Sequence, residues 1–378
     1  MKIIWFSEIK WSFLKTRKQQ ILSSFSEQDT IYFIEPVSKR IVNKFTLQEN
    51  KPVYYITIPH LRSVRSLLLN RIFKISAVRK IISIVSELWF RIFQLTHRIN
   101  PDIVITSNVY WADTLQSMKS KNSRLRIVYD CNDNPLAFPH TPDFKRNYFL
   151  KTVSLADAIV IPHSSYKEII PLDHQKKIKI ISNGVDYGMF KTKNKIPEAI
   201  INVGHPIIMY VGAISAWFDF ELVEKTAQTL QDHQIVLIGP VSADVRKGLD
   251  KLLGFDNLIH ISTIPHDEII NYVDHADVCI IPFIRNKLTS TVLPNKVFEY
   301  TAAGKTCIMT NFNESLHEFD GFVHIADSPE DFIEKIEEGI RDPFDPKSLK
   351  LFAKEYDWKN ISVKFRNFLE SIIHDQTE

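Results

Sequence analysis

Lys296 and Glu299 have the residue types and the spacing to bind the charged and hydroxylated parts of a nucleotide. They lie in the stretch LPNKVFEYTAAG (residues 293–304), and a separation of three residues places both side chains on one face of a helix. The lysine supplies a positive charge for a phosphate, and the glutamate carboxylate can accept hydrogen bonds from the two hydroxyls of a ribose. The alternative is an ordinary capped helix whose Lys and Glu simply face water.

The residues around this stretch predict a strand, a loop and a helix N-terminus. The apolar run 276–283 is the expected strand, and Pro294 fits a first helical turn, where the N–H that proline lacks would have no partner anyway. The free backbone N–H groups and the positive end of the helix dipole then favour an anion in the loop. Ser290 and Thr291 in that loop could hydrogen-bond a phosphate or a sugar.

Two further turns in the second half of the chain could complete such a site. The strand expected at 207–211 ends at Gly212, which lets the backbone approach a diphosphate, with Ala213 beneath it. The turn after the strand expected at 258–263 places Ile264 where it could pack on a base. All ten glycines lie at or beyond Gly184, so a nucleotide should bind to the second half of the chain.

A strand ending in Pro-Phe, a loop and then P-x-K-x-x-E-Y-x-A-A-G-K resembles the nucleotide-sugar site of GT-B glycosyltransferases. The resemblance is to glycosyltransferase family 4, and in particular to membrane-associated sugar transferases of bacterial exopolysaccharide and teichuronic acid assembly. It implies that Glu299 holds the donor ribose and Lys296 the diphosphate of a nucleotide sugar, with a UDP-sugar as the expected donor. The family often has another glutamate eight residues before the first, and here Thr291 stands at that position.

A second group of candidate residues follows the strand expected at 126–130. The sequence RIVYDCNDNP (residues 126–135) runs from this strand into a loop that contains Asp130 and Asp133. Such a loop opens at the edge of a parallel sheet where ligands bind, and a carboxylate there could take the proton of an acceptor hydroxyl. Formation of a turn is the alternative role. The resemblance implies an Asp or His as base at this strand end, and we place Asp133 first and Asp130 second.

The order of the expected elements predicts an α/β fold with two domains. A chain of 378 residues exceeds what one hydrophobic core usually serves, and strands alternate with helices as in parallel sheets. We expect an N-terminal acceptor-binding domain over residues 1–183, a nucleotide-sugar-binding domain over 184–350 and a last helix over 351–378. The resemblance implies the GT-B arrangement, in which two Rossmann-like domains face a cleft and the last helix crosses back to the first domain.

Charge is distributed unevenly between the two halves of the chain. Residues 1–180 contain 28 Lys and Arg against 14 Asp and Glu, whereas the remaining residues contain 19 against 30. A basic half favours an anionic partner, and nucleic acid is the weaker candidate because no recognition motif is present. Residues 60–100 combine eight basic residues with many apolar ones, which is typical of helices that lie on an anionic membrane surface.

Within that region the sequence predicts two different environments. For residues 61–80 we favour contact with the membrane, and for residues 81–96 we favour packing of the apolar face on the sheet. The acceptor or membrane contacts expected in the first half are Arg17, Arg62, Arg65, Arg71 and Lys74. No run approaches the roughly 20 apolar residues of a membrane span, and the charged start is unlike a signal peptide. We therefore expect a cytoplasmic protein, peripheral on the inner face of the cell membrane.

Together these features predict a hexosyltransferase that moves a sugar from a nucleotide sugar to a hydroxyl of a lipid-linked or growing cell-surface polysaccharide. No cofactor and no metal are expected, because Lys296 and helix N-termini can neutralise the departing diphosphate, and no Asp-x-Asp motif occurs. A nucleotide-sugar epimerase of the same architecture is one alternative. A catalytically silent scaffold tethered to the membrane is the other, and Thr291 in place of the family's glutamate favours it.

Overall fold

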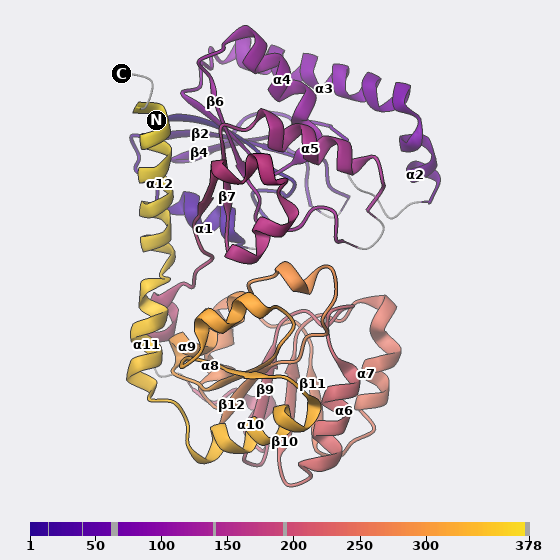
Figure 1. Cartoon of the computed structure of the whole chain (residues 1–378), viewed down its shortest axis with the longest axis vertical. Coiled ribbons are helices and arrows are strands. Elements are labelled where there is room, and N and C mark those ends of the chain that lie inside the picture. Colours follow the sequence, from indigo (N-terminus) through magenta and orange to yellow (C-terminus); the bar gives the residue numbers. More distant parts are fainter. Residues whose placement is uncertain (14, 40, 62–66, 139–140, 192–194, 375–378) are drawn as a thin grey trace. The chain divides into compact units, whose positions relative to one another are not determined.

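The computed structural model describes residues 1–374 except 14, 40, 62–66, 139–140 and 192–194, and it contains two compact α/β units (Figure 1). The first unit consists of Met1–Ser182 with Lys359–Glu378, and the second of Asn183–Trp358. Each unit is built on its own sheet, and nearly all strand pairs are parallel. The expected α/β class with two Rossmann-like parallel sheets is confirmed.

The sheet of the first unit has the strand order β3-β4-β2-β1-β5-β6-β7-β8, and among its described strands only β3 and β4 pair antiparallel. Its strands are β1 (Lys2–Phe6), β2 (Thr30–Glu35), β3 (Gln48–Asn50), β4 (Val53–Thr57), β5 (Ile103–Thr106), β6 (Arg126–Asp130), β7 (Ala158–Ile161) and β8 (Ile178–Ile180). The helices of this unit are α1 (Arg17–Ser23), α2 (Leu67–Lys74), α3 (Ser76–Thr96), α4 (Ala112–Lys121), α5 (Lys145–Leu155) and α12 (Trp358–His374).

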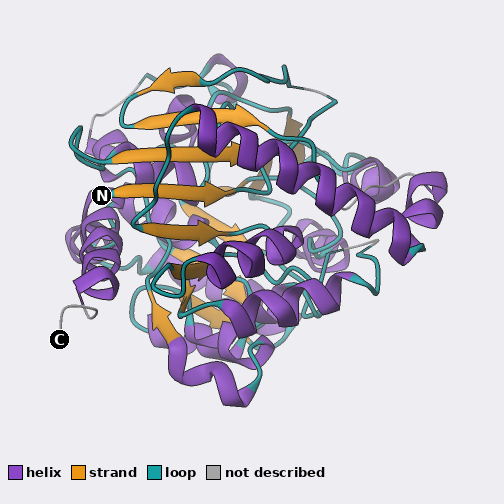
Figure 2. Ribbon diagram, turned by 90° about the horizontal axis from the view of Figure 1, so that it is seen from above, coloured by secondary structure: helices purple, strands orange, loops and turns teal. Residues whose placement is uncertain are grey.

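Strand β1 shows how helices come to cover both faces of this sheet (Figure 2). Successive side chains of a strand point to opposite faces. Phe6 packs edge-on against Phe90 of α3, with ring centroids 4.9 Å apart. Its neighbour Trp5 points the other way and stacks on Phe365 of α12 at 5.8 Å. The carboxyl ends of the parallel strands remain uncovered by these helices and are available for a ligand.

The sheet of the second unit has the strand order β11-β10-β9-β12-β13-β14. Its strands are β9 (Ile207–Val211), β10 (Gln234–Ile238), β11 (Leu258–Ile261), β12 (Val278–Ile281), β13 (Cys307–Thr310) and β14 (His324–Ala326). Its helices are α6 (Phe220–Thr229), α7 (Arg246–Leu252), α8 (Ile269–Val273), α9 (Asn295–Ala303), α10 (Pro329–Arg341) and α11 (Pro346–Glu355). The strand order reverses between β9 and β12, and an open α/β sheet binds its ligands at such a point.

The last two helices belong to different units. Helix α11 packs on α9 of the second unit, where the rings of Phe298 and Phe352 stack with centroids 6.2 Å apart. Helix α12 packs in the first unit, where the Ser362 hydroxyl donates a hydrogen bond to the Ile21 carbonyl at 2.7 Å. The chain therefore returns to the first unit as expected. The return comes after Trp358 rather than after residue 350, because aromatic contacts hold α11 to the second unit.

Helix α3 packs on the sheet through part of residues 81–96, as expected, because Phe90 contacts Phe6 of β1, but it leaves a second apolar side exposed. Ser83, Ser86, Phe90 and Phe93 are its buried residues. Six aliphatic side chains of the same helix are exposed: Ile81, Ile84, Val85, Leu88, Ile92 and Leu95. The helix is apolar on more than one side, so the hydrophobic pattern did not indicate which side is buried.

Candidate functional site

The carboxyl ends of β9 and β12 bring together the residues expected to bind a nucleotide. Gly212 follows β9, and the loop after β12 leads into α9. The backbone N–H of Val211 donates a hydrogen bond to the Tyr300 hydroxyl at 2.9 Å, which fastens α9 to the end of β9. Gly212 has a φ of +147°, and a Cβ at this position would lie 2.4 Å from Nζ of Lys296. The structure thus places Lys296 directly beside the turn that follows β9.

Lys296 is a half-buried cation. Its Nζ lies 5.3 Å from the centroid of the Tyr210 ring and 5.7 Å from that of Phe283. In the part of the chain that the structure describes, neither the Lys296 nor the Glu299 side chain forms a hydrogen bond or an ion pair. Burial lowers the pKa of the Lys296 ammonium, and the nearby Glu299 carboxylate opposes that shift. An anionic ligand beside Nζ would supply the partner that this charge lacks.

Ala213 and Ile264 lie at the same edge of the second sheet. The Ala213 carbonyl accepts hydrogen bonds from the Tyr210 hydroxyl at 2.8 Å and from the Trp217 indole at 3.2 Å. These bonds fix the turn that carries Gly212. Ile264 is half-buried in the loop after β11 and packs on the hydrophobic core. Its place after the strand matches the position expected to contact a base.

Thr291 stands where the resembling family often has a glutamate, and its surroundings do not suit that role. The side chain is 2% exposed, and its hydroxyl donates a hydrogen bond to the Leu288 carbonyl at 3.2 Å. The hydroxyl that was expected to contact a donor phosphate or sugar therefore points to Leu288 in this structure. Ser290 is half-buried, and its hydroxyl lies 3.4 Å from the Lys287 carbonyl.

A pocket of about 500 Å³ lies in the first unit at the carboxyl ends of β1, β2, β5 and β6. Its lining mixes apolar with ionisable side chains. The apolar part includes Ile9, Phe13, Val37, Ile41, Val109 and Phe138, and the ionisable part includes Glu8, Lys10, Asp130, Asp133 and Lys145. Across the described residues, no group of three or more His, Cys, Asp or Glu side chains could hold a metal ion.

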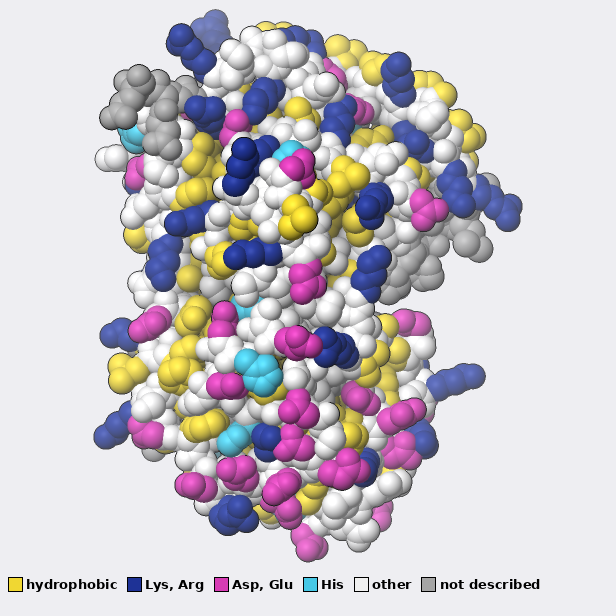
Figure 3. Space-filling model, in the orientation of Figure 1, with side chains coloured by type: hydrophobic (Ala, Val, Ile, Leu, Met, Phe, Trp, Pro, Cys, Tyr) yellow, Lys and Arg dark blue, Asp and Glu magenta, His cyan; other side chains and the backbone are white. Residues whose placement is uncertain are grey.

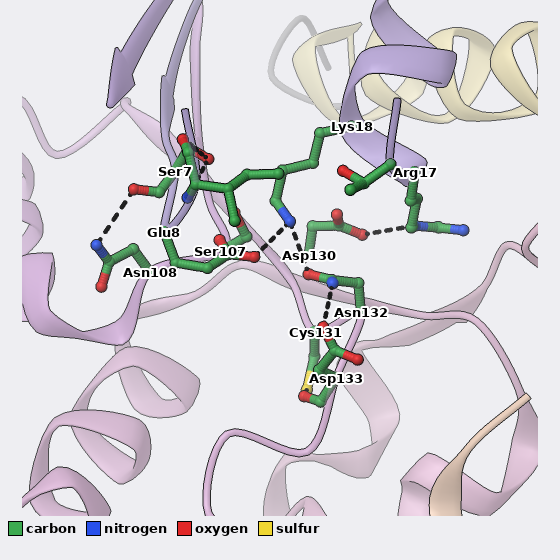
Figure 4. A network of polar contacts seen from close by, with 12 residues as sticks. Ser7, Glu8, Arg17, Lys18, Ser107, Asn108, Asp130, Cys131, Asn132 and Asp133 are labelled. Atoms are coloured by element: carbon green, nitrogen blue, oxygen red, sulfur yellow. Dashed lines mark hydrogen bonds and ion pairs between the residues drawn. The ribbon is translucent and has the colours of Figure 1, made fainter. Parts of the chain in front are cut away.

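Asp133 lines this pocket from the loop after β6 (Figure 4). Asp133 is an exposed residue, and neighbouring atoms of the pocket wall replace part of the water around its carboxyl. This partial desolvation raises the pKa of the Asp133 carboxyl to about 6. The negative charges of Glu8 and Asp130 act in the same direction, and the positive charges of Lys18 and Lys145 oppose them. Such a carboxyl is ionised at neutral pH and has a suitable pKa for a general base.

A chain of polar contacts orients the Asp133 carboxylate. The buried ammonium of Lys18 on α1 donates hydrogen bonds to Glu8 Oε1 at 2.5 Å and to Asn132 Oδ1 at 3.2 Å. Because the amide oxygen of Asn132 is engaged by Lys18, its Nδ2 turns to Asp133 and donates to Oδ2 at 2.7 Å. Figure 4 shows these contacts linking α1 to the loop after β6.

Asp130 ends β6 and is fully buried in an ion pair with Arg17, with Nε and Oδ1 3.3 Å apart. The Arg17 guanidinium, 5% exposed, also donates to the backbone carbonyls of Ser182 at 2.6 Å and Ile181 at 2.8 Å. Asp130 Oδ2 has no hydrogen-bond partner among the described residues. Arg17, which was expected to contact an acceptor, thus binds Asp130 and the backbone that follows β8 in this structure.

Lys145, the first residue of α5, lines the pocket and was not expected from the sequence. Its Nζ lies 5.7 Å from the centroid of the Tyr110 ring, and among the described residues it has no hydrogen bond or ion pair. Burial lowers the pKa of Lys145, and the charges of Glu8 and Asp133 raise it. No local motif marks this lysine, because only the fold brings it into one pocket with Asp133.

The basic residues expected at a membrane lie in and before α2. Arg62 and Arg65 fall outside the described residues, so the structure gives no account of them. Arg71 and Lys74 are exposed in the last turn of α2. Over the described ranges, no helix is both long enough and apolar enough to cross a bilayer.

Sequence comparison gives its clearest result for the second unit. Residues 205–342 match the family described as glycosyl transferases group 1. A protein of Bacillus subtilis (strain 168), named as a teichuronic acid biosynthesis glycosyltransferase, TuaH, is 24% identical over 253 residues. The alignment covers 62% of this chain and 64% of the relative, so the chain spans less than two thirds of that relative's length.

Solved structures resemble the whole chain. Sucrose-phosphate synthase from Thermosynechococcus elongatus has a TM-score of 0.75 at 11% identity, with 99% of this chain and 100% of that chain covered. HepE of Anabaena, solved in complex with UDP, has a TM-score of 0.68 at 13% identity, with coverage of 98% and 100%. At these identities the likeness shows a shared fold.

Proposed function

We propose that this chain is a GT-B glycosyltransferase that transfers a sugar from a UDP-sugar to an acceptor hydroxyl. Residues 205–342 match the glycosyl transferases group 1 family, and the fold of the whole chain resembles that of sucrose-phosphate synthase. HepE, which is similar in fold, binds UDP and UDP-glucose in its crystals, and this supports a uridine nucleotide. The proposed acceptor is a lipid-linked or growing cell-surface polysaccharide. The teichuronic acid role in the name of the Bacillus relative supports this acceptor class.

The observation that carries the proposal is the pair Lys296 and Glu299 beside Gly212. Both are half-buried charged groups that lack partners within the described residues, at the point where the second sheet reverses its strand order. Lys296 would neutralise the diphosphate, assisted by the N–H groups in the first turn of α9. Glu299 would accept hydrogen bonds from the ribose hydroxyls. In this proposal no metal is needed to stabilise the departing UDP.

On the first unit, the acceptor hydroxyl would bind in the pocket that Asp133 lines. As its oxygen attacks the anomeric carbon, the bond between that carbon and the UDP oxygen breaks, and the hydroxyl proton passes to the Asp133 carboxylate. Asn132, held by Lys18, keeps the carboxylate in position through its 2.7 Å hydrogen bond. Asp130 is the weaker candidate for the base, because it is fully buried and paired with Arg17.

An acceptor attached to a lipid requires the enzyme to work at the inner face of the cell membrane. The excess of basic residues in the first half and the exposed Arg71 and Lys74 on α2 support this location. A cytoplasmic, peripheral protein would reach such an acceptor without spanning the bilayer.

Thermal unfolding with UDP, GDP, CMP and dTDP tests the donor site. A nucleotide at about 100 times its dissociation constant should add roughly 2.7 kcal/mol to the free energy of unfolding. UDP should stabilise the wild type and Glu337→Gln, a matched change on the exposed side of α10, but not Glu299→Gln. The assignment would be contradicted if UDP still raised the unfolding temperature of Glu299→Gln, or if it did not raise that of the wild type.

Transfer itself is tested with radiolabelled UDP-sugars and membrane lipid extracts. We expect label to move into material soluble in organic solvent, and we expect Asp133→Asn to lose this transfer while still binding UDP. Conversion of the donor to an isomer without transfer would indicate an epimerase. Donor binding with neither reaction would indicate a silent scaffold.

A further inference from the structure

Helix α3 presents a continuous apolar stripe to solvent. The stripe consists of Ile81, Ile84, Val85, Leu88, Ile92 and Leu95, whose exposed fractions run from 55% to 78%. These positions are spaced by three or four residues and so form one face of the helix. Figure 3 shows hydrophobic side chains gathered along the edge of the molecule where α3 runs in Figure 1. A soluble surface rarely leaves so many neighbouring aliphatic groups in water without a partner.

The other face of α3 already packs in the core. Phe90 and Phe93 join the cluster beneath the helix, and the Ser86 hydroxyl donates to the Pro59 carbonyl at 2.7 Å. At about 100° per residue, the buried and exposed sets point in roughly opposite directions. The stripe therefore cannot become the packed face by a small rotation of the helix, because that would pull the two phenylalanines out of the core.

The charges around the stripe are almost all positive. Arg71, Lys74, Lys80 and Arg98 are exposed, and among the described residues they have no acidic partner. Glu87 is the sole acidic residue between positions 60 and 100, and it pairs with Arg91. An apolar face bordered by unpaired cations fits a surface that combines hydrocarbon with negative charge.

We propose that the α3 stripe is the face by which the protein lies on an anionic lipid bilayer, with the aliphatic side chains in the acyl boundary and the flanking cations at lipid headgroups. A second copy of this chain fits less well. Pairing two stripes would bring Lys80 and Arg98 of both copies to one contact with no exposed acid on the stripe to offset them.

This inference deepens the proposed function, on which it rests for the reason to reach a membrane. It also connects the bilayer to the acceptor pocket. The first half of α3 lies at the carboxyl edge of the sheet, where the Ser83 hydroxyl donates to Asp113 Oδ2 at 3.2 Å. The Arg79 guanidinium lies 4.4 Å from the centroid of the Phe144 ring, next to Lys145 in the pocket lining. Docking through α3 would thus place the pocket close to lipid-linked acceptors.

Flotation of the full-length protein with vesicles tests the proposal. The vesicles are phosphatidylcholine with or without phosphatidylglycerol, and the test variant is Ile84→Asp with Leu88→Asp. A matched control is Leu172→Asp with Val363→Asp, which changes exposed apolar residues of the same unit outside α3. We expect the wild type and the control to float with phosphatidylglycerol vesicles and the α3 variant to bind at least about tenfold more weakly.

A second variant, Arg71→Glu with Lys74→Glu, should weaken binding to the anionic vesicles only, and added salt should have the same effect. The UDP thermal shift, measured without vesicles, should be unchanged in all variants. If neither the wild type nor any variant binds UDP, but vesicle binding changes as expected, the result would contradict the donor site and leave the docking proposal standing. Equal flotation of the α3 variant and the wild type would overturn the docking proposal. A wild-type dimer that the α3 variant converts to monomer, without vesicle binding, would overturn it in favour of a second copy.

Discussion

The Lys296 ammonium lies against the Cα of Gly212, so closely that a Cβ on the glycine would be 2.4 Å from both Cε and Nζ of the lysine. The two residues come from different elements of the second unit, the turn after β9 and the first turn of α9. Because glycine has no side chain, the backbone of the turn at Gly212 is not covered, and the positive charge of Lys296 lies directly beside it. Diphosphate recognition needs this combination, because backbone N–H groups and a cation can then share the same oxygens.

Gly212→Ala should abolish the UDP thermal shift while the second unit stays folded. The new methyl group must displace the end of Lys296, and alanine at a φ of +147° adds backbone strain of about 1–3 kcal/mol. Gly204→Ala is the control, because a Cβ there meets only Gln234 Cγ at 3.9 Å. A Gly212→Ala protein that binds UDP as tightly as the wild type would show that the contact has no role in donor binding.

Lys296→Met should make the ligand-free protein more stable and insensitive to UDP. Burial lowers the pKa of Lys296, so the charged form is disfavoured in the folded state relative to the unfolded chain. Methionine removes that cost, and we expect a gain of about 1 kcal/mol at neutral pH. The sign is checked by raising the pH. When the lysine pKa is lowered in the folded state, the unfolded chain binds more protons than the folded chain at pH values above that lowered pKa. The wild type should therefore become more stable as Lys296 loses its proton, whereas the stability of the variant should not rise in this way.

Lys287→Met is the matched control for this substitution, because Lys287 is exposed in the loop before α9. It should change neither the stability nor the UDP shift appreciably. A less stable Lys296→Met protein would indicate that the lysine has a structural partner rather than a ligand.

The pH dependence of transfer should report the Asp133 carboxyl. Its pKa of about 6 predicts that kcat/KM rises as pH increases through that value and then levels off, because only the carboxylate can take a proton. Asp133→Asn should lower the rate by about 10²–10⁴-fold, and its kcat/KM should no longer show this rise on the acid side of the pH profile, the acid limb. Lys18→Met should move the limb to higher pH, because it removes a positive charge that lowers the Asp133 pKa.

Stability serves as the folding check for Asp133→Asn. A carboxyl with a raised pKa contributes stability to the folded state that is fully present below its unfolded pKa of 3.8 and is lost as pH rises through about 6. At neutral pH the asparagine variant should therefore unfold at a temperature no lower than the wild type. An acid limb that is the same in Asp133→Asn as in the wild type would assign the base to another residue.

Local sequence could predict the arrangement of the residues in the proposed donor site. Lys296 and Glu299 share a helical face because they are three residues apart, and Gly212 ends an apolar strand. Two parallel sheets followed from the alternation of strands and helices. Thr291 could not be judged this way, because its burial depends on how the loop before α9 folds back on Leu288.

The features of the first unit that the sequence did not reveal share one physical cause. They depend on contacts between residues that are far apart in the chain. Arg17 was expected to contact an acceptor or the membrane, but its partner Asp130 is more than a hundred positions away in sequence and 3.3 Å away in space. Lys145 entered the pocket in the same way, through packing of α5 on the sheet. For α3 the sequence was apolar on several sides, so tertiary contacts with Phe6 decided which side was buried.

The Arg17–Asp130 pair should behave as a structural unit of the first domain. Breaking it with Arg17→Met leaves a fully buried carboxylate without its cation, and we expect a loss of about 3–5 kcal/mol. The double variant Arg17→Met with Asp130→Leu should recover most of that loss, since an apolar pair of similar size avoids the desolvation of two charges. Hydrogen exchange of the β6 amides measures the stability of the first unit alone. A global unfolding curve of a protein with two units does not separate the two. Losses that simply add in the double variant would show that the two residues are not coupled, and Asp130 would then return as a candidate for the base.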